Sequence, residues 1–193
     1  MAPDPTLDPA VDPTTVTAAE HEERAVVTAR RATPDIDESA MRVGLNLVRA
    51  SNSLITEAES EMARTVGLSW PSFRVLFITW MYGAVEARSI ARIAGVTRQT
   101  VSSVLSTVER RGYVQRQKTD ESDRRLVTVR LTPLGRDVVQ RAFALHNRVE
   151  SRHLEALSTD ERAQLAALLA KVVRHDGNPA AEPAESGGTR AAG

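Results

Sequence analysis

The chain has 193 residues, of which 41% are hydrophobic, 4% aromatic and 26% charged, and its 25 basic and 25 acidic residues give no net charge. This balance is typical of one globular domain, and so few aromatic residues predict a core of aliphatic side chains packed mainly in helices. The absence of cysteine excludes disulfides, thiolate metal ligands and thiol-based redox sensing, and no segment approaches the ~20 apolar residues that span a bilayer.

The two ends of the chain differ in composition from the segment between them. Residues 1–34 are rich in proline, alanine, threonine and acidic residues, so we expect an acidic, mostly disordered extension in which 15–32 could form a short helix. The start of the chain lacks the features of a secretory signal, which predicts a cytoplasmic protein. Residues 176–193 form a low-complexity tail that we also expect to be disordered. The main domain should therefore occupy residues 35–175.

Hydrophobic spacing predicts two helices at the start of this domain. Apolar residues between 37 and 66 recur at steps of three, four or seven, the spacing of one helix face, and Gly67 follows as a stop. A second helix should begin near Ser69, a suitable N-cap, carry Pro71 in its first turn and end at Gly83. Its buried face should include Phe73, Leu76, Phe77, Trp80 and Met81.

The next segment has the pattern of a helix-turn-helix followed by a β-hairpin. A short helix is expected over 87–94, then a tight turn, and then a second helix from the cap residue Thr97 to a stop at Gly112. Residues 113–118 and 126–131 should pair as strands on either side of an all-polar tip. In such an arrangement the second helix enters the major groove of DNA, and the hairpin, or wing, reaches the backbone or minor groove.

Two further helices close the domain. Thr132 and Pro133 suit the N-cap and first helical position of a long helix that ends near residue 157. Ser158 and Glu161 form a capping box for a last helix. That last helix should bury Leu165, Leu168, Leu169 and Val172.

The summed pattern predicts a mainly α fold with a small β-wing, in the order α-α-α-α-β-β-α-α. A winged helix-turn-helix at 69–131 would lie between dimerisation helices at 37–66 and 133–175. The outer helices are too long and apolar to be covered by so small a winged core. We therefore expect a homodimer in which a second copy of the chain covers them.

Charge is divided unevenly along the chain. Residues 1–40 hold nine acidic against three basic residues, a net charge of −6, whereas residues 88–131 hold ten basic against four acidic residues, a net charge of +6. The basic block coincides with the helix-turn-helix and the wing. This coincidence favours double-stranded DNA as a partner.

The second helix of the helix-turn-helix offers side chains suited to reading DNA. Arg98 and Gln99 lie in its first turn, and these residue types form paired hydrogen bonds with the edges of guanine and adenine, respectively. Small hydroxyl side chains would let the helix lie close to the duplex and donate to phosphates: Thr100, Ser102, Ser103 and Ser106. The plainer interpretation is a solvated helix face. The neighbouring short helix and basic hairpin favour DNA contact.

The wing supplies a second set of candidate DNA contacts. Asp123 should pair with a basic neighbour and hold the shape of the tip, which would leave Arg125 for the minor groove. The plainer interpretation is a solvated hairpin turn. Further basic residues complete the predicted DNA-contacting set, mainly through phosphates: Arg110, Arg111, Arg116 and Arg124.

These residues resemble the multiple-antibiotic-resistance regulator (MarR) family of winged-helix transcription factors. The resemblance covers roughly residues 37–174, and its most specific motif is Asp123-Arg124-Arg125 followed by Val129-Arg130-Leu131-Thr132-Pro133-Leu134-Gly135. It implies an obligate dimer on a pseudo-palindromic operator, commonly repressing a nearby gene and released by a small ligand. The tip has Glu121 and Ser122 where the family often has Pro and Arg, so this wing is more acidic.

The resemblance also implies an effector site between the dimerisation helices and the winged unit. Candidate linings for a small aromatic or anionic ligand are Trp70, Trp80, Tyr82 and His146, with Arg74 as a partner for an anion. The alternative is that the tryptophans belong to the core and that His146 packs between helices or at the surface.

No residue pattern indicates an enzyme, a metal site or a cofactor. The four histidines lack metal-ligand spacing with acidic residues, and phosphate-binding loops, nucleophile elbows and paired carboxylates are missing. Glu57, Glu59 and Glu61 are interpreted as a solvated helix face. The remaining alternative to a DNA-binding regulator is a winged-helix protein-docking module whose basic block meets an acidic partner, such as the N-terminal extension of the chain itself.

Overall fold

The computed structural model describes residues 15–118 and 127–175, so the tip of the predicted wing lies outside the described residues. The chain forms two compact units, Met1–Ser53 and Leu54–Gly193. Helix α2 (Glu38–Val66) contributes its first part to one unit and its last part to the other. Each unit is held together by its own contacts.

The first unit contains a helix that composition did not favour. Helix α1 (Ala18–Ala32) begins with a capping box, in which the Thr17 hydroxyl accepts the backbone N–H of Glu20 and the Glu20 carboxylate accepts that of Thr17. Arg42 on α2 binds Glu22 at 2.8 Å and Glu23 at 2.6 Å. The short helix considered over 15–32 is therefore present.

In the second unit, α2 and α3 (Trp70–Tyr82) are joined through an unexpected cap. Ser69 occupies the N-cap position, but its hydroxyl donates to the hydroxyl of Ser72 at 3.0 Å rather than accepting a backbone N–H. The carboxylate of Glu59 accepts the backbone N–H of Trp70 at 2.9 Å instead. The interpretation of Glu59 as a solvated residue is therefore wrong, because it caps the neighbouring helix.

Helix α3 buries most of the predicted face but not all of it. Phe73 and Leu76 are buried, and Phe77 and Trp80 are partly buried against the core. Met81 was expected inside, but 52% of its surface is exposed. It lies in the last turn of α3, just before the chain turns at Gly83.

The helix-turn-helix forms as the sequence predicts. Helix α4 (Ala87–Ala94) ends at Gly95, whose φ of +63° lies in the left-handed region that glycine adopts without strain. Helix α5 (Arg98–Arg110) begins after Thr97, whose hydroxyl accepts the backbone N–H of Thr100 at 3.1 Å. One face of α5 packs into the core through Val101, Leu105 and Val108.

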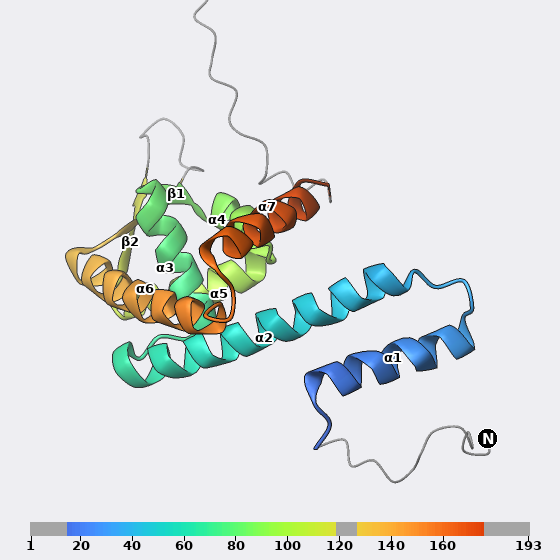
Figure 1. Ribbon diagram of the computed structural model, residues 1–193. Coiled ribbons are helices and arrows are strands. Elements are labelled where there is room, and N and C mark those ends of the chain that lie inside the picture. Colours follow the sequence, from blue (N-terminus) through green and yellow to red (C-terminus); the bar gives the residue numbers. More distant parts are fainter. Residues whose placement is uncertain (1–14, 119–126, 176–193) are drawn as a thin grey trace, which may run out of the picture. The chain divides into compact units, whose positions relative to one another are not determined.

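Three antiparallel strands form a small sheet in the order β1-β3-β2, seen in Figure 1 beside α3 and α4. β2 (Val114–Lys118) and β3 (Val127–Leu131) are the predicted hairpin strands, with Val114 opposite Leu131. β1 (Val85–Glu86) pairs with the other edge of β3 and was not predicted, because two residues are too few to show alternation. The sheet connects the helix-turn-helix to the wing.

Helix α6 (Pro133–His153) begins as predicted and ends earlier than residue 157. The hydroxyl of Thr132 accepts the backbone N–H of Gly135 at 3.0 Å and donates to the carbonyl of Gly112 at 2.6 Å. The cap therefore also fixes α6 to the turn that follows α5.

Helix α7 (Thr159–His175) begins with the predicted capping box between Ser158 and Glu161. None of its residues is buried within the chain. Leu165, Leu168 and Val172 are 37%, 55% and 48% exposed, so the expected burial of these residues does not occur inside a single copy.

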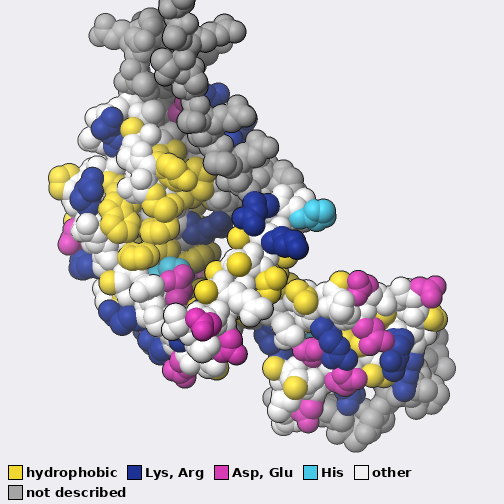
Figure 2. Space-filling model, turned by 45° about the horizontal axis from the view of Figure 1, so that its top comes forward, with side chains coloured by type: hydrophobic (Ala, Val, Ile, Leu, Met, Phe, Trp, Pro, Cys, Tyr) yellow, Lys and Arg dark blue, Asp and Glu magenta, His cyan; other side chains and the backbone are white. Residues whose placement is uncertain are grey.

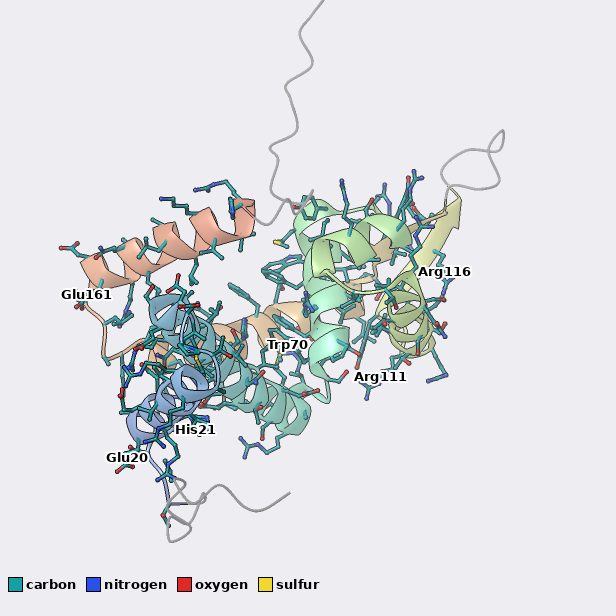
Figure 3. All side chains as sticks on the ribbon, turned by 90° about the vertical axis from the view of Figure 1, so that its right-hand side faces the viewer. Glu20, His21, Trp70, Arg111, Arg116 and Glu161 are labelled. Atoms are coloured by element: carbon teal, nitrogen blue, oxygen red, sulfur yellow. The ribbon has the colours of Figure 1, made fainter. Side chains whose placement is uncertain are left out.

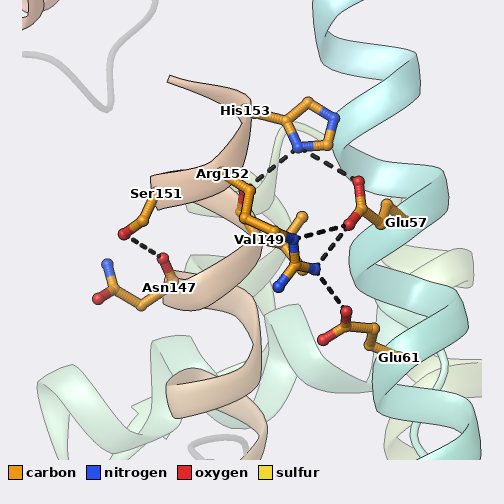
Figure 4. Close-up of polar contacts among 7 residues, drawn as sticks. All are labelled: Glu57, Glu61, Asn147, Val149, Ser151, Arg152 and His153. Carbon is orange, nitrogen blue, oxygen red and sulfur yellow. Dashed lines mark hydrogen bonds and ion pairs between the residues drawn. The ribbon is translucent and has the colours of Figure 1, made fainter. Parts of the chain in front are cut away.

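A cluster of charged residues ties the end of α6 to α2 (Figure 4). Arg152 donates to the carboxylate of Glu57 at 2.6 Å and also to that of Glu61, while His153 lies 3.4 Å from Glu57. The hydrogen bond from Arg152 holds the pKa of Glu57 below its usual value. Glu57 and Glu61 therefore hold two helices together, and their interpretation as a solvated face is wrong.

Candidate nucleic-acid interface

The exposed face of α5 carries the six residues that the sequence predicted to read bases or to bring this helix close to the duplex. All six side chains are exposed and lie away from the buried valine and leucine positions: Arg98, Gln99, Thr100, Ser102, Ser103 and Ser106. The helix thus presents a continuous polar surface that starts at its first turn.

Hydrogen bonding within α5 separates these residues into two kinds. Thr100 shares its hydroxyl with that of Thr97 at 2.8 Å, and Ser106 donates to the carbonyl of Ser102 at 3.0 Å. The side chains of Arg98, Gln99, Ser102 and Ser103 make no hydrogen bond or ion pair among the described residues. Of these four, Arg98 and Gln99 are the ones that can form paired hydrogen bonds with a base edge.

The three arginines predicted to contact phosphates, Arg110 at the end of α5 and Arg111 and Arg116 beyond it, differ in their surroundings. Arg110 is exposed without a partner among the residues that the structure describes, whereas Arg116 pairs with Glu109 at 3.0 Å. Arg111 donates to the backbone carbonyl of Gly67 at 2.6 Å, and its guanidinium lies 5.7 Å from the centre of the Tyr113 ring. Figure 3 shows Arg111 and Arg116 at the α5 side of the unit, with Arg116 on β2. Arg111 is thus engaged in holding the fold.

The wing-tip residues that complete the predicted set are Asp123, Arg124 and Arg125, and they lie outside the described residues. The strands that carry the tip are in place, since β2 and β3 pair as far as Lys118 and Val127.

Sequence reasoning missed two arginines on the helix before α5. Arg88 and Arg92 of α4 line, together with Arg98, a hollow of about 540 Å³ whose other lining residues are Ser89, Ala91 and Val96. The signal was present in the sequence, because arginines four positions apart lie on the same face of a helix. Arg88 pairs with Glu86, while Arg92 has no partner in the described part of the chain.

The candidate effector residues do not converge on one cavity. Trp70 and His146 lie close together, with ring centres 5.3 Å apart, and Trp80 joins the same aromatic cluster through Phe77 and Phe143. Tyr82 is 62% exposed. The alternative interpretation of the tryptophans as core residues therefore describes most of their contacts.

His146 occupies an unusual position inside this aromatic cluster. Its Nε2 lies 3.1 Å from the carboxylate of Glu150, and its side chain is only 12% exposed. Its buried Nδ1 has no hydrogen-bond partner among the described residues. A buried polar atom of this kind is costly unless a partner reaches it.

Arg74 contacts the helix-turn-helix. It donates to the backbone carbonyl of Ala94, and with Trp70 and Thr100 it lines a separate, mostly apolar cavity of about 70 Å³ between α3 and the helix-turn-helix. Trp70 is the one candidate that borders both the cavity and the aromatic cluster.

Hydrophobic side chains also gather on the surface of the second unit. Figure 2 shows hydrophobic side chains gathered in a wide patch on the exposed face of the Leu54–Gly193 unit, with basic side chains near its edge.

Within residues 15–118 and 127–175, no group of three or more His, Asp or Glu side chains is placed to hold a metal ion. Among these same residues, no helix is long and apolar enough to cross a membrane.

The order of helices and strands, with α5 following a short helix and preceding a β-hairpin, defines a winged helix-turn-helix protein. A profile of the MarR family matches residues 68–127. Over 133 residues the chain is 33% identical to YwaE, an HTH-type transcriptional regulator of Bacillus subtilis, and the match covers 69% of this chain and 77% of that protein. The chain belongs to the MarR family.

Two further relatives extend this comparison. The chain is 33% identical over 156 residues to the HTH-type transcriptional regulator PecS of Dickeya dadantii, covering 76% of this chain and 89% of PecS. Rv2887, a MarR family protein of Mycobacterium tuberculosis, has been solved in complex with DNA, and that structure aligns at 27% identity and a TM-score of 0.55 over 67% of this chain and 95% of the other. Rv2887 with salicylic acid aligns at 28% identity and the same TM-score, over 67% and 94%.

Proposed function

We propose that this protein is a transcriptional repressor that binds a pseudo-palindromic operator as a homodimer and is released by a small aromatic or anionic ligand. The observation that carries the proposal is the exposed face of α5, where Arg98 and Gln99 stand in the first turn without partners among the described residues. The Rv2887 complex with DNA supports it, because that relative has the same fold. Such a protein would work in the cytoplasm, where bacterial DNA lies.

The proposed dimer is supported by the exposed apolar side of α7. Leu168 is 55% exposed and Val172 is 48% exposed, on a helix that buries none of its residues within the chain. Exposed leucine and valine at helical spacing are typical of a surface covered by a second subunit. In a dimer on straight DNA, the two copies of α5 would lie roughly 34 Å apart and enter successive major grooves.

The proposed effector is a small aromatic acid. The Rv2887 complex with salicylic acid supports this class of ligand, and the chain offers an aromatic cluster around His146 together with a cavity beside Arg74. The buried Nδ1 of His146 is a polar atom that a ligand hydroxyl or carboxyl would satisfy.

Binding of the purified full-length protein to sheared genomic DNA tests the function. We expect selective capture of fragments that contain an inverted repeat, with an affinity that falls steeply as salt is raised. No binding at moderate salt would overturn the proposal in favour of a protein-docking module. Thermal unfolding with salicylate tests the effector, because a ligand that binds only the native state raises the midpoint temperature.

A further inference from the structure

We propose that the hollow between α4 and the start of α5 binds a phosphodiester of the DNA backbone, held chiefly by Arg92 and Arg98. This inference rests on the proposed function and adds to it a second helix, α4, as part of the DNA-binding surface. The contact would fix the depth and angle at which α5 enters the major groove, because phosphate contacts position a protein on the duplex.

The charges around the hollow favour an anion. Its lining contains three arginines and no carboxylate, and its volume is about 540 Å³. Arg88 pairs with Glu86, which lies outside the lining. Arg92 and Arg98 are exposed and have no partner among the described residues. Two uncompensated positive charges therefore border one hollow, and an anion placed there lowers their mutual repulsion.

The backbone and a hydroxyl add donors at the same place. The Thr97 hydroxyl accepts the N–H of Thr100, so the first two backbone N–H groups of α5, those of Arg98 and Gln99, have no acceptor within the helix. The N-terminal end of this 13-residue helix also carries a partial positive charge. Ser89 lines the hollow and supplies a hydroxyl of the kind that donates to phosphate.

The position of the hollow favours a phosphate that belongs to DNA over a free anion. Arg98 lines the hollow and also begins the exposed face of α5, so an anion bound there lies next to Gln99. Arg98 would then contact this phosphate instead of a base edge, and Gln99 would remain the base contact of the first turn. In helix-turn-helix proteins the first helix crosses the DNA backbone while the second lies in the groove. A phosphodiester beside the first turn of α5 fits this geometry.

Arg92 also has a structural role, which an experiment has to distinguish from a phosphate contact. It lies in the last turn of α4, where a positive side chain interacts favourably with the helix C-terminus. That role predicts a change in stability when Arg92 is removed and no change in the salt dependence of DNA binding. The phosphate contact predicts the opposite: a lower salt dependence of DNA binding and little change in stability.

The experiment measures fluorescence anisotropy of full-length variants on a genomic fragment that the wild type binds, across a salt series. Arg92→Ala should weaken binding about fivefold and lower the slope of log affinity against log salt by about 0.9, the value for one lost phosphate contact. Glu86→Gln should do the opposite and tighten binding, because it frees Arg88. Arg148→Ala, which removes an exposed charge from α6, should leave the slope unchanged.

Each outcome decides a separate question. If the wild type binds no DNA fragment, the proposed function fails and this inference fails with it. If the wild type binds while Arg92→Ala keeps its affinity and slope, only the inference is overturned. If inorganic phosphate raises the melting temperature of the wild type but not of Arg92→Ala, and DNA binding is equal in both, the hollow is a free-anion site instead. If Arg92→Ala does not fold, Arg92→Gln decides, since it keeps most of the side chain and removes the charge, and an unchanged salt slope then overturns the contact.

Discussion

The guanidinium of Arg111 donates a hydrogen bond of 2.6 Å to the backbone carbonyl of Gly67, which joins the end of α5 to the end of α2. Gly67 has a φ of +66°, a conformation that favours glycine, and a Cβ at this position would lie 3.6 Å from Arg111. Of the arginines near α5, Arg111 therefore donates its hydrogen bond within the fold. The neighbouring Arg110 is exposed to solvent.

This difference predicts opposite effects of two neighbouring substitutions. Arg111→Ala should lower the free energy of unfolding by about 1 kcal/mol through the lost hydrogen bond and leave the salt slope of DNA binding unchanged. Arg110→Ala should lower the slope and leave stability unchanged. Urea unfolding and DNA titration of both variants check this. A lowered slope and wild-type stability in Arg111→Ala would return that residue to the phosphate contacts.

A pair of glycines predicts a contrast in stability. A Cβ at Gly135 would lie 1.9 Å from the carbonyl oxygen of Tyr113, so Gly135→Ala should destabilise the protein by about 3 kcal/mol or prevent folding. At Gly44, within α2, nothing lies within 4 Å of such a Cβ, and Gly44→Ala should stabilise the helix by about 0.5–1 kcal/mol. Thermal unfolding of both variants measures the difference, and equal effects would contradict the close contact.

The position of Gln99 in the first turn of α5 predicts that its removal weakens the preference for the operator sequence. Gln99→Ala should cost ~1–3 kcal/mol of discrimination between an operator and a scrambled duplex, because Gln pairs with a base edge and carries no charge. Affinity for the scrambled duplex should change little. Parallel titrations with the two duplexes measure this, and Ser151→Ala on α6 serves as a polar control. An equal loss on both duplexes would mean that Gln99 contacts only the backbone.

The exposed side of α7 predicts how the dimer is weakened. Leu168→Glu should raise the dimer dissociation constant roughly hundredfold, because a carboxylate is costly to bury at an apolar interface. Ala166→Glu adds the same charge two positions away, on the opposite side of the helix, and should leave the dimer intact. Sedimentation velocity over a dilution series distinguishes the two. Unchanged association of Leu168→Glu would show that another surface forms the dimer.

The hydrogen bond from Arg152 to Glu57 predicts that the free energy of unfolding depends on pH. A carboxyl whose folded pKa is lowered contributes stability above its unfolded pKa of about 4.3 and loses that contribution as pH falls through the folded value. Arg152→Ala should therefore destabilise the protein at pH 7, and the difference from the wild type should shrink in acid. Urea unfolding midpoints of both proteins, measured at pH 7 and in acid, check this. Arg141→Ala, which removes an exposed pair within one helix, should change little at either pH.

The elements that sequence predicted well are those whose ends depend on near neighbours. Thr97 and Thr132 each cap a backbone N–H three residues ahead, and Ser158 does the same with Glu161. Such bonds need no tertiary contact, so residue types at fixed spacing are enough to predict them. The exposed face of α5 followed in the same way from the spacing of its buried residues.

The features that sequence missed depend on distant parts of the chain. Glu59 caps α3 from eleven residues away, and Arg111 reaches a carbonyl forty-four residues earlier. β1 exists only because β3 offers it an edge, and α7 lacks a buried face within one copy. The hollow at Arg92 could not be predicted, because it depends on the angle between α4 and α5, and hydrophobic periodicity does not give that angle.

The corner at Gly135 has a mechanical consequence. The Thr132 hydroxyl holds the carbonyl of Gly112, and Gly135 allows the backbone of Tyr113 to lie directly against the start of α6. Helix α6 therefore begins where α5 ends and β2 starts, and these contacts hold the three elements together at one corner. A rotation of α6 would therefore carry α5 and β2 with it, and in a dimer it would change the distance between the two copies of α5 without changing the structure of either copy.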